Sequence, residues 1–182
     1  PTATAGAAEG GELGHHGTFA EAAAGADLVF NVTPGVHSLA ALALAGQEHL
    51  DGKVLIDVSN PLDFSQGFPP RLSVGQGDSL AEQIQAAHPG ARVVKALNTV
   101  SNTVMVDPAG LGEATDLPIC GNDAEAKAEV ATLLRDALGW ERIVDLGDLS
   151  NARGTEAWLL LWTRLYGALG TADFNLKLVV KR

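Results

Sequence analysis

The sequence predicts an α/β protein with a mostly parallel sheet and helices on both of its faces. Three short apolar runs, within 26–35, 53–61 and 91–102, share one design: each is aliphatic and then breaks at a polar or proline-containing corner. Near-continuous apolar strands are typical of parallel sheets that are buried on both faces. Helical patterns separate the runs, so the order is strand, helix, strand, helix, strand. Because open α/β sheets bind ligands at the carboxyl ends of their strands, we expect the site at these corners.

The boundaries of the elements follow from capping residues and apolar periodicity. Thr18 and Glu21 form a predicted capping box, and Leu39, Leu42 and Leu50 are expected to face the core. The region 60–77 holds three prolines and three glycines and is expected to contain no regular element. The helices are expected at about 18–25, 35–50, 79–88, 123–138 and 151–169, the strands at 27–32, 54–58, 92–97, 117–120 and 143–146, and an extended tail at 174–180.

Composition limits the classes of partner. The net charge of −10 argues against nucleic acid or an anionic membrane as a general partner. No apolar stretch approaches the roughly 20 residues of a membrane-spanning helix. The single cysteine, Cys120, lies in an apolar run and cannot form an internal disulfide, so we expect a buried thiol and a cytoplasmic protein. The pair His15 and His16 has no further ligand at metal-binding spacing, and no metal site is expected.

Two charged positions and one helix invite specific expectations. Lys95 interrupts an apolar strand, so it should face an anionic ligand or pair with an acid such as Asp57 or Glu156. Arg153, three residues before Glu156, is expected to pair with it within the helix. The helix at 151–169 carries Trp158 and is apolar on nearly all sides, which predicts a core helix that also contributes to a homodimer.

Several blocks of the chain resemble the NADPH-dependent reductases of coenzyme F-420, a deazaflavin. They are LVFNVTPG at 28–35, KVLIDVSNPLDFSQGFPP at 53–70, VVKALNTV at 93–100, ICGNDAEAK at 119–127 and DLGDLSNARGTEAWLLLW at 145–162. The resemblance implies a Rossmann-type domain with a short C-terminal extension. We accordingly expect a flexible segment at 1–17, a partial Rossmann domain at 18–149, and a helix with an extended tail at 150–182.

That family opens with a strand, a glycine-rich turn and a helix that binds the cofactor pyrophosphate, and no such stretch is found in this sequence. We therefore expect the chain to be N-terminally truncated, with a βαβ unit before Pro1. The determinants of NADP over NAD would lie in that unit. On this expectation the 182 residues alone bind NADPH weakly, if at all, and do not turn over.

The resemblance also implies which residues form the site. Asn98 and Thr99 match the strand end where the nicotinamide meets its hydride partner. The residues that match other cofactor-facing positions are Val32, Thr33, Pro34, His37, Asn60, Pro61, Ala96, Leu97, Asn151 and Arg153. Two structural alternatives stay open, because Pro34 could simply start a helix and Asn98 could be a turn residue.

The activity implied is hydride transfer between the nicotinamide of NADP and a deazaflavin such as coenzyme F-420, or a similar acceptor. No set of nucleophile, base and orienting residue can be recognised from spacing, which fits chemistry carried by cofactors. The alternative is a non-catalytic binding or interaction module on a partial Rossmann scaffold.

Overall fold

The computed structural model describes residue 11 and residues 14–181. Much of the glycine-rich segment expected to be flexible at 1–17, namely 1–10, 12 and 13, lies outside these residues. Within them the chain forms one five-stranded sheet in the order β1-β2-β5-β6-β7. The strands are β1 (Leu28–Asn31), β2 (Val54–Asp57), β5 (Arg92–Lys95), β6 (Asp116–Gly121) and β7 (Arg142–Asp145). The prediction of a mostly parallel α/β sheet is confirmed, because β1, β2 and β5 are mutually parallel and only the β5–β6 pairing is antiparallel.

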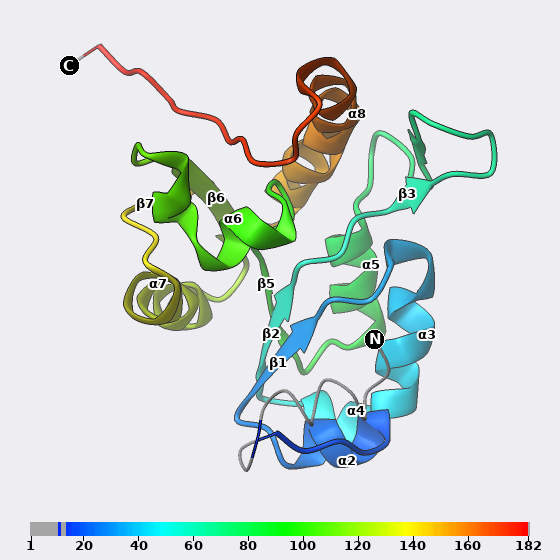
Figure 1. Ribbon diagram of the computed structural model, residues 1–182. Helices are drawn as coiled ribbons and strands as arrows, with labels where there is room; N and C mark the ends of the chain where they lie inside the picture. The colour runs from blue at the N-terminus through cyan, green and yellow to red at the C-terminus, as the bar shows by residue number, and fades with distance from the viewer. Residues whose placement is uncertain (1–10, 12–13, 182) are drawn as a thin grey trace.

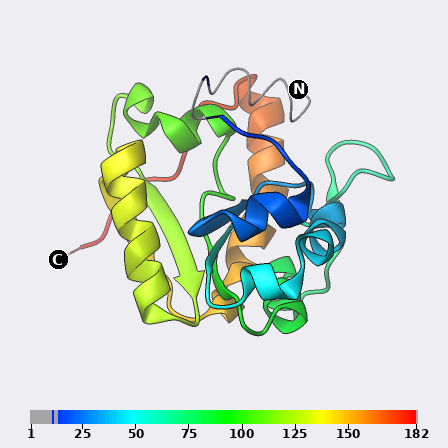
Figure 2. The same ribbon diagram turned by 90° about the horizontal axis from the view of Figure 1, so that it is seen from below.

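Helices cover both faces of the sheet (Figure 1). Figure 1 shows α7 on one side of β1, β2 and β5, and α3 and α5 on the other; Figure 2 gives the view from below. The helices are α2 (Phe19–Ala24), α3 (Gly35–Ala45), α4 (Gln47–Leu50), α5 (Leu80–Ala87), α6 (Asn102–Val106), α7 (Ala124–Leu138) and α8 (Ala152–Leu169), with short 3₁₀ turns η2 (Pro108–Leu111) and η3 (Leu149–Asn151). Two apolar clusters result, one on each face.

The caps behave as the sequence predicts. Thr18 and Glu21 form the capping box of α2, Ser79 caps α5, Asp123 caps α7, and Gly139 ends α7 in the left-handed conformation. The side chains of Thr18, Ser79 and Asp123 accept hydrogen bonds from backbone N–H groups in the first turns of α2, α5 and α7. Such caps are local, which explains why these boundaries could be predicted closely.

The prediction of a single helix at 35–50 is wrong. The chain breaks at Gly46, whose φ of 85° lies outside the helical region, so α3 and α4 are separate. The buried side of α3 differs from the prediction at one position. Leu42 and Leu50 face the core as expected, but Leu39 stays 37% exposed and Ser38 is buried in its place.

The region 60–77 is more regular than expected. Its ends pair as two short antiparallel strands, β3 (Leu62–Asp63) and β4 (Arg71–Leu72). Asp63 closes the turn that follows β3 by accepting a hydrogen bond from the backbone N–H of Ser65. This pairing spans the seven residues 64–70 and leaves no periodic pattern in the sequence.

Helix α8 packs on the sheet through a narrow and partly polar stripe. Its buried residues are Ala152, Thr155, Glu156, Leu159 and Thr163. Trp158 and Trp162 flank this stripe and are only partly buried, so the helix is not enclosed on all sides. After α8 the chain is extended, as predicted, and joins the start of β6 through the bond from Asp116 N–H to the Leu176 carbonyl, at 3.0 Å. Figure 1 shows its last residues leading away from the sheet.

Two further observations bear on the overall architecture. Within the described residues β1 pairs with β2 alone, so its other edge is open, whereas β2 lies between two strands. Among the helices of the described part of the chain, none combines the length and the apolar character that crossing a membrane requires.

Candidate functional site

The carboxyl ends of β1, β2 and β5 lie side by side because the three parallel strands pair in register. Asn31 is opposite Asp57, and Asp57 is opposite Lys95. The residues that follow each strand therefore meet at one edge of the sheet. The structure brings together there ten of the predicted positions, namely Val32, Thr33, Pro34, His37, Asn60, Pro61, Ala96, Leu97, Asn98 and Thr99.

The turn after β1 presents an accessible surface on a fixed base. Val32 is 68% exposed, and Pro34 and His37 are exposed as well. Below them the Thr33 hydroxyl donates to Asn31 Oδ1 at 2.6 Å. Pro34 occupies the N-cap position of α3 without making a side-chain cap, so the N-terminus of this eleven-residue helix has no capping side chain. A helix N-terminus of this kind is suited to an anionic group.

The start of α3 lies directly against the corner after β2. A Cβ atom at Gly35 would lie 2.1 Å from the carbonyl oxygen of Asn60, so only glycine fits. Pro34 does begin a helix, and that helix begins at the strand-end edge; a role of this turn in binding the cofactor stays a prediction.

Asn98 connects three segments. Its Nδ2 donates to Asn60 Oδ1 at 3.0 Å and to the Thr155 carbonyl at 3.1 Å, while Asn60 Nδ2 donates to the Asn98 carbonyl at 2.9 Å. The corners after β2 and β5 are thereby joined to each other and to α8. Asn98 is 1% exposed, so it forms part of the floor of the site and not of its rim.

The corner after β5 shows two signs of a functional site. Leu97 has a φ of 64°, a left-handed conformation that is uncommon for a residue with a side chain. Within the described residues the buried atoms Asn98 Oδ1 and Thr99 Oγ1 have no hydrogen-bond partner. Strained backbone and unsatisfied buried polar atoms are rare in folded proteins and concentrate where ligands bind.

A mostly apolar cavity of about 240 Å³ adjoins Thr99. Its walls include Trp158 from α8, Leu146 from the turn after β7, and Leu176 from the tail. The Trp158 indole is held in place because its Nε1 donates to the Thr99 carbonyl at 3.1 Å. The cavity can accept a flat apolar group next to the strand-end edge.

The structure places the two predicted residues of α8 and η3 in other contacts. Arg153 forms a fork with Glu82 on α5, at 2.8 and 2.6 Å, and the expected pairing with Glu156 is wrong because Glu156 turns into the core. The hydrogen bond from Arg153, chiefly, holds the pKa of Glu82 below its usual range. Asn151 donates to the Asp148 carbonyl, and no hydrogen bond in the described part of the chain joins it to the strand ends.

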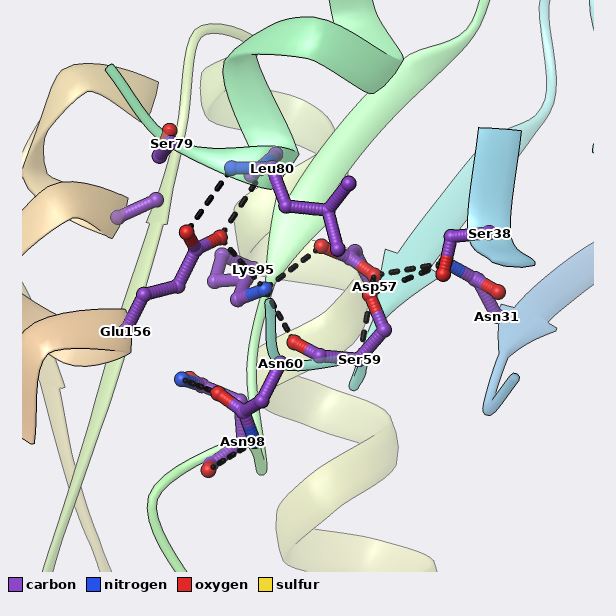
Figure 3. A network of polar contacts seen from close by, with 12 residues as sticks. Asn31, Ser38, Asp57, Ser59, Asn60, Ser79, Leu80, Lys95, Asn98 and Glu156 are labelled. Atoms are coloured by element: carbon purple, nitrogen blue, oxygen red, sulfur yellow. Dashed lines mark hydrogen bonds and ion pairs between the residues drawn. The ribbon is translucent and has the colours of Figure 1, made fainter. Parts of the chain in front are cut away.

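Directly beneath the site lies a buried charge cluster (Figure 3). Lys95 Nζ lies 2.7 Å from Asp57 Oδ2 and 2.9 Å from Glu156 Oε1, and all three side chains are fully buried. Both acids named as possible partners of Lys95 are thus its partners. Burial alone would lower the pKa of Lys95, but the two carboxylates outweigh it and the pKa is raised, which keeps the ammonium charged.

The sequence reasoning missed Asn31 and Ser38. Asn31 donates to Asp57 Oδ1 at 2.9 Å, and the hydroxyl groups of Ser38 and Thr33 lie 3.0 Å apart. A polar residue inside the apolar run of β1 was a signal of the same kind as Lys95 in β5, and could have been read in the same way.

Comparison with known proteins places the chain in a family. It is 54% identical to a proposed F420-dependent NADP reductase from Arthrobacter sp. FB24, covering 91% of this chain and 76% of that one with a TM-score of 0.89. The F420-dependent NADP reductase of Methanocaldococcus jannaschii is 32% identical over 138 residues, which are 75% of this chain and 60% of that protein. The rat metalloreductase STEAP3 is 34% identical over 75% of this chain and 26% of its own length.

An imine reductase from Myxococcus stipitatus, 20% identical with a TM-score of 0.60, shares the fold. No family model matches the chain. The chain spans about 60% of the length of the Methanocaldococcus reductase. Its likeness to the Arthrobacter protein extends over most of both chains, and its fold is of the Rossmann type. The chain belongs to the F420-dependent NADP reductase family.

Proposed function

We propose that this chain forms the nicotinamide half of an oxidoreductase that transfers a hydride between NADP(H) and the deazaflavin F420. The observation that carries the proposal is the corner after β5, at the edge shared by three strand ends. There Leu97 is strained, and Asn98 and Thr99 hold buried atoms that have no hydrogen-bond partner among the described residues. Membership of the F420-dependent NADP reductase family supplies the reaction class.

Each part of the edge has a proposed role. The N-terminus of α3 and the exposed Val32, Pro34 and His37 hold a phosphate or ribose oxygen of the nucleotide. Asn98 Oδ1 accepts a hydrogen bond at the hydride end, and Thr99 Oγ1 accepts or donates one. Hydride transfer requires no general base, but it does require the two ring carbons to be held roughly 3–3.5 Å apart. The cofactors supply the chemistry, and the residues of this chain bind, orient and exclude water.

The acceptor is proposed to enter from the side of α8. The cavity beside Thr99 offers Trp158 and Leu176 as apolar walls for a planar ring. Arg153 and Asn151 are proposed to lie along the path of the acceptor, at the start of the same helix. Arg153 keeps two-fifths of its side chain exposed while it binds Glu82, so it can also contact an anionic group.

The test is an activity assay with NADPH and F420, in which the absorbance of the deazaflavin reports its reduction. Because the sequence holds no glycine-rich phosphate turn, the 182 residues are expected to bind NADPH more weakly than the full-length Methanocaldococcus reductase. The same 182 residues joined to the βαβ unit of that reductase are expected to reduce F420. Tight NADPH binding by the 182 residues alone would contradict the first expectation. NADPH binding without any hydride transfer by the joined protein would favour a binding module.

A homodimer and a cytoplasmic location complete the proposal. The end of α8 and the tail expose apolar residues that one chain leaves uncovered, namely Leu161, Tyr166, Leu169, Leu176, Leu178, Val179 and Val180. A second copy with the same surfaces would cover them. The buried free thiol of Cys120 is in keeping with a reducing compartment.

A further inference from the structure

Asp57 controls the turn after β1 through a chain of hydrogen bonds. As a carboxylate it can only accept, and its Oδ1 receives Asn31 Nδ2 at 2.9 Å. Asn31 Oδ1 must then face Thr33, whose hydroxyl donates to it at 2.6 Å. Because that proton is committed, the contact of 3.0 Å between Thr33 and Ser38 has Ser38 as the donor. The Thr33 hydroxyl is thereby fixed as an acceptor toward any ligand.

Glu156 controls the corner after β5 from the other side. Its two oxygens accept the backbone N–H groups of Leu80 and Ala81, at 2.9 and 3.2 Å, which ties α8 to the N-terminus of α5. One residue before Glu156, the Thr155 carbonyl accepts from Asn98. The position of Glu156 therefore sets where α8 meets Asn98.

Lys95 is the group that both arms share. Its ammonium contacts Asp57 and Glu156 and donates to the Ser59 carbonyl at the corner after β2 (Figure 3). Without the ammonium, two carboxylates would face each other in a fully buried space, and at least one would have to rotate, take up a proton or admit water. Each of these responses disturbs the contacts that hold Asn31 or Thr155, and with them the atoms that line the site.

We propose that Lys95 is a positioning residue: from beneath the site, and without touching the ligand, it fixes the Thr33 hydroxyl through Asp57 and the Asn98 amide through Glu156. The ligand it serves is the nucleotide of the function proposed above. The cluster thus couples the two walls of the site, which lie in segments more than sixty positions apart in the sequence.

The test uses Lys95→Met in the 182-residue chain, with two readouts. The first is the pair of side-chain amide signals of Asn31 and Asn98 in ¹⁵N NMR spectra, which requires no ligand. The second is the NADPH concentration at which the chemical shift of the Thr33 backbone amide has made half of its total change. In Lys95→Met, both Asn signals are expected to move or broaden. The NADPH concentration needed for the half-maximal shift is expected to rise at least tenfold relative to wild type. Lys127→Met removes a lysine paired with Asp145 at the edge of the molecule, and should change neither readout.

A merely structural role gives a different result. In that case Lys95→Met lowers the melting temperature, but the folded protein keeps both Asn signals, which would overturn the proposal. If Lys95→Met does not fold, the neutral variant Asp57→Asn, Lys95→Met, Glu156→Gln decides by the same signals, since neutral replacement of buried ion pairs is well tolerated. If neither the wild type nor the joined protein responds to NADPH, the proposed function fails, while the Asn31 and Asn98 signals still decide the role of Lys95.

Discussion

At the scale of single residues, burial decides what a side chain does. Asn98 was expected to stand at the hydride end of the site, and the structure shows that it also joins Asn60 to Thr155. The alternative of a mere turn residue is therefore too simple, because Asn98 holds two corners and one helix together. Its catalytic role stays a prediction.

Asn98→Leu tests that role. In protein that reduces F420, we expect kcat to fall roughly 100-fold, because a displacement of about 1 Å at the reacting atoms costs that much. NADPH affinity should change little, since the phosphates bind elsewhere. Asn122→Leu is the control: Asn122 follows β6, which runs antiparallel to β5, and its Oδ1 accepts from the Leu149 N–H at 3.0 Å, away from the carboxyl ends of β1, β2 and β5. Steady-state kinetics that show equal kcat in wild type and Asn98→Leu would remove Asn98 from the site.

Cys120 gives a second prediction at this scale. The thiol is fully buried, and burial raises its pKa to about 12, so the reactive thiolate is scarce at pH 8. Iodoacetamide should leave the folded protein unmodified and alkylate it rapidly in urea, as followed by mass spectrometry. Rapid alkylation of the folded chain would mean that Cys120 is accessible.

At the scale of elements, the two ends of α5 show which features a local sequence pattern predicts and which it does not. The N-terminal cap, Ser79, was predictable because the capping rule is local. The carboxylate of Glu156 also binds this N-terminus, from 76 positions further along the chain. At the C-terminal end His88 is buried, and its Nδ1 has no partner within the described residues. Neither the Glu156 contact nor the burial of His88 can be inferred from local pattern.

His88 makes stability depend on pH. Burial, opposed by the charge of Asp51, lowers the pKa of His88 from its usual 6.5. In the unfolded chain the ring takes up its proton near pH 6.5, and in the folded chain only at lower pH. The folded state therefore loses stability as the pH falls below 6.5 through the lowered pKa. Urea titrations should show this loss in wild type and less of it in His88→Gln. Identical curves for the two proteins between pH 7 and 5 would show that His88 is not the group responsible.

At the scale of the whole molecule, the strands of the sheet could be predicted and several long-range contacts could not. Apolar runs and caps determine β1, β2 and β5, because each signal is contained within a few residues. The break at Gly46, the pairing of β3 with β4, and the choice of Glu82 by Arg153 depend on partners brought close only by the fold. The site follows the same division: its strand ends were located, whereas Asn31 and Ser38 were not.

The buried cluster of Lys95, Asp57 and Glu156 should strongly affect the free energy of unfolding. Lys95→Met leaves two carboxylates without a cation, and we expect it to reduce the free energy of unfolding by about 3–5 kcal/mol. The neutral triple variant should recover most of that loss. Chemical denaturation measures both, and a loss under about 1 kcal/mol in Lys95→Met would show that the cluster relaxes without cost.

Association is the other property of the whole chain. Tyr166 and Leu169 lie on the exposed end of α8, and replacing both with Glu should convert the proposed dimer into a monomer. Leu44→Glu changes an equally exposed leucine on α3 and should not affect the dimer. Light scattering at micromolar concentration reports the mass, and a monomeric wild type would contradict the proposal.

The most direct test of the central claim is an NADPH titration of the ¹⁵N-labelled chain followed by NMR. Chemical shifts detect weak binding, so the measurement does not depend on high affinity or on turnover. We expect shifts to concentrate in the backbone amides of 32–37, 60–62 and 96–99, the three strand-end segments that meet at one edge. Saturable shifts that cluster elsewhere would contradict the placement of the nicotinamide nucleotide at this edge.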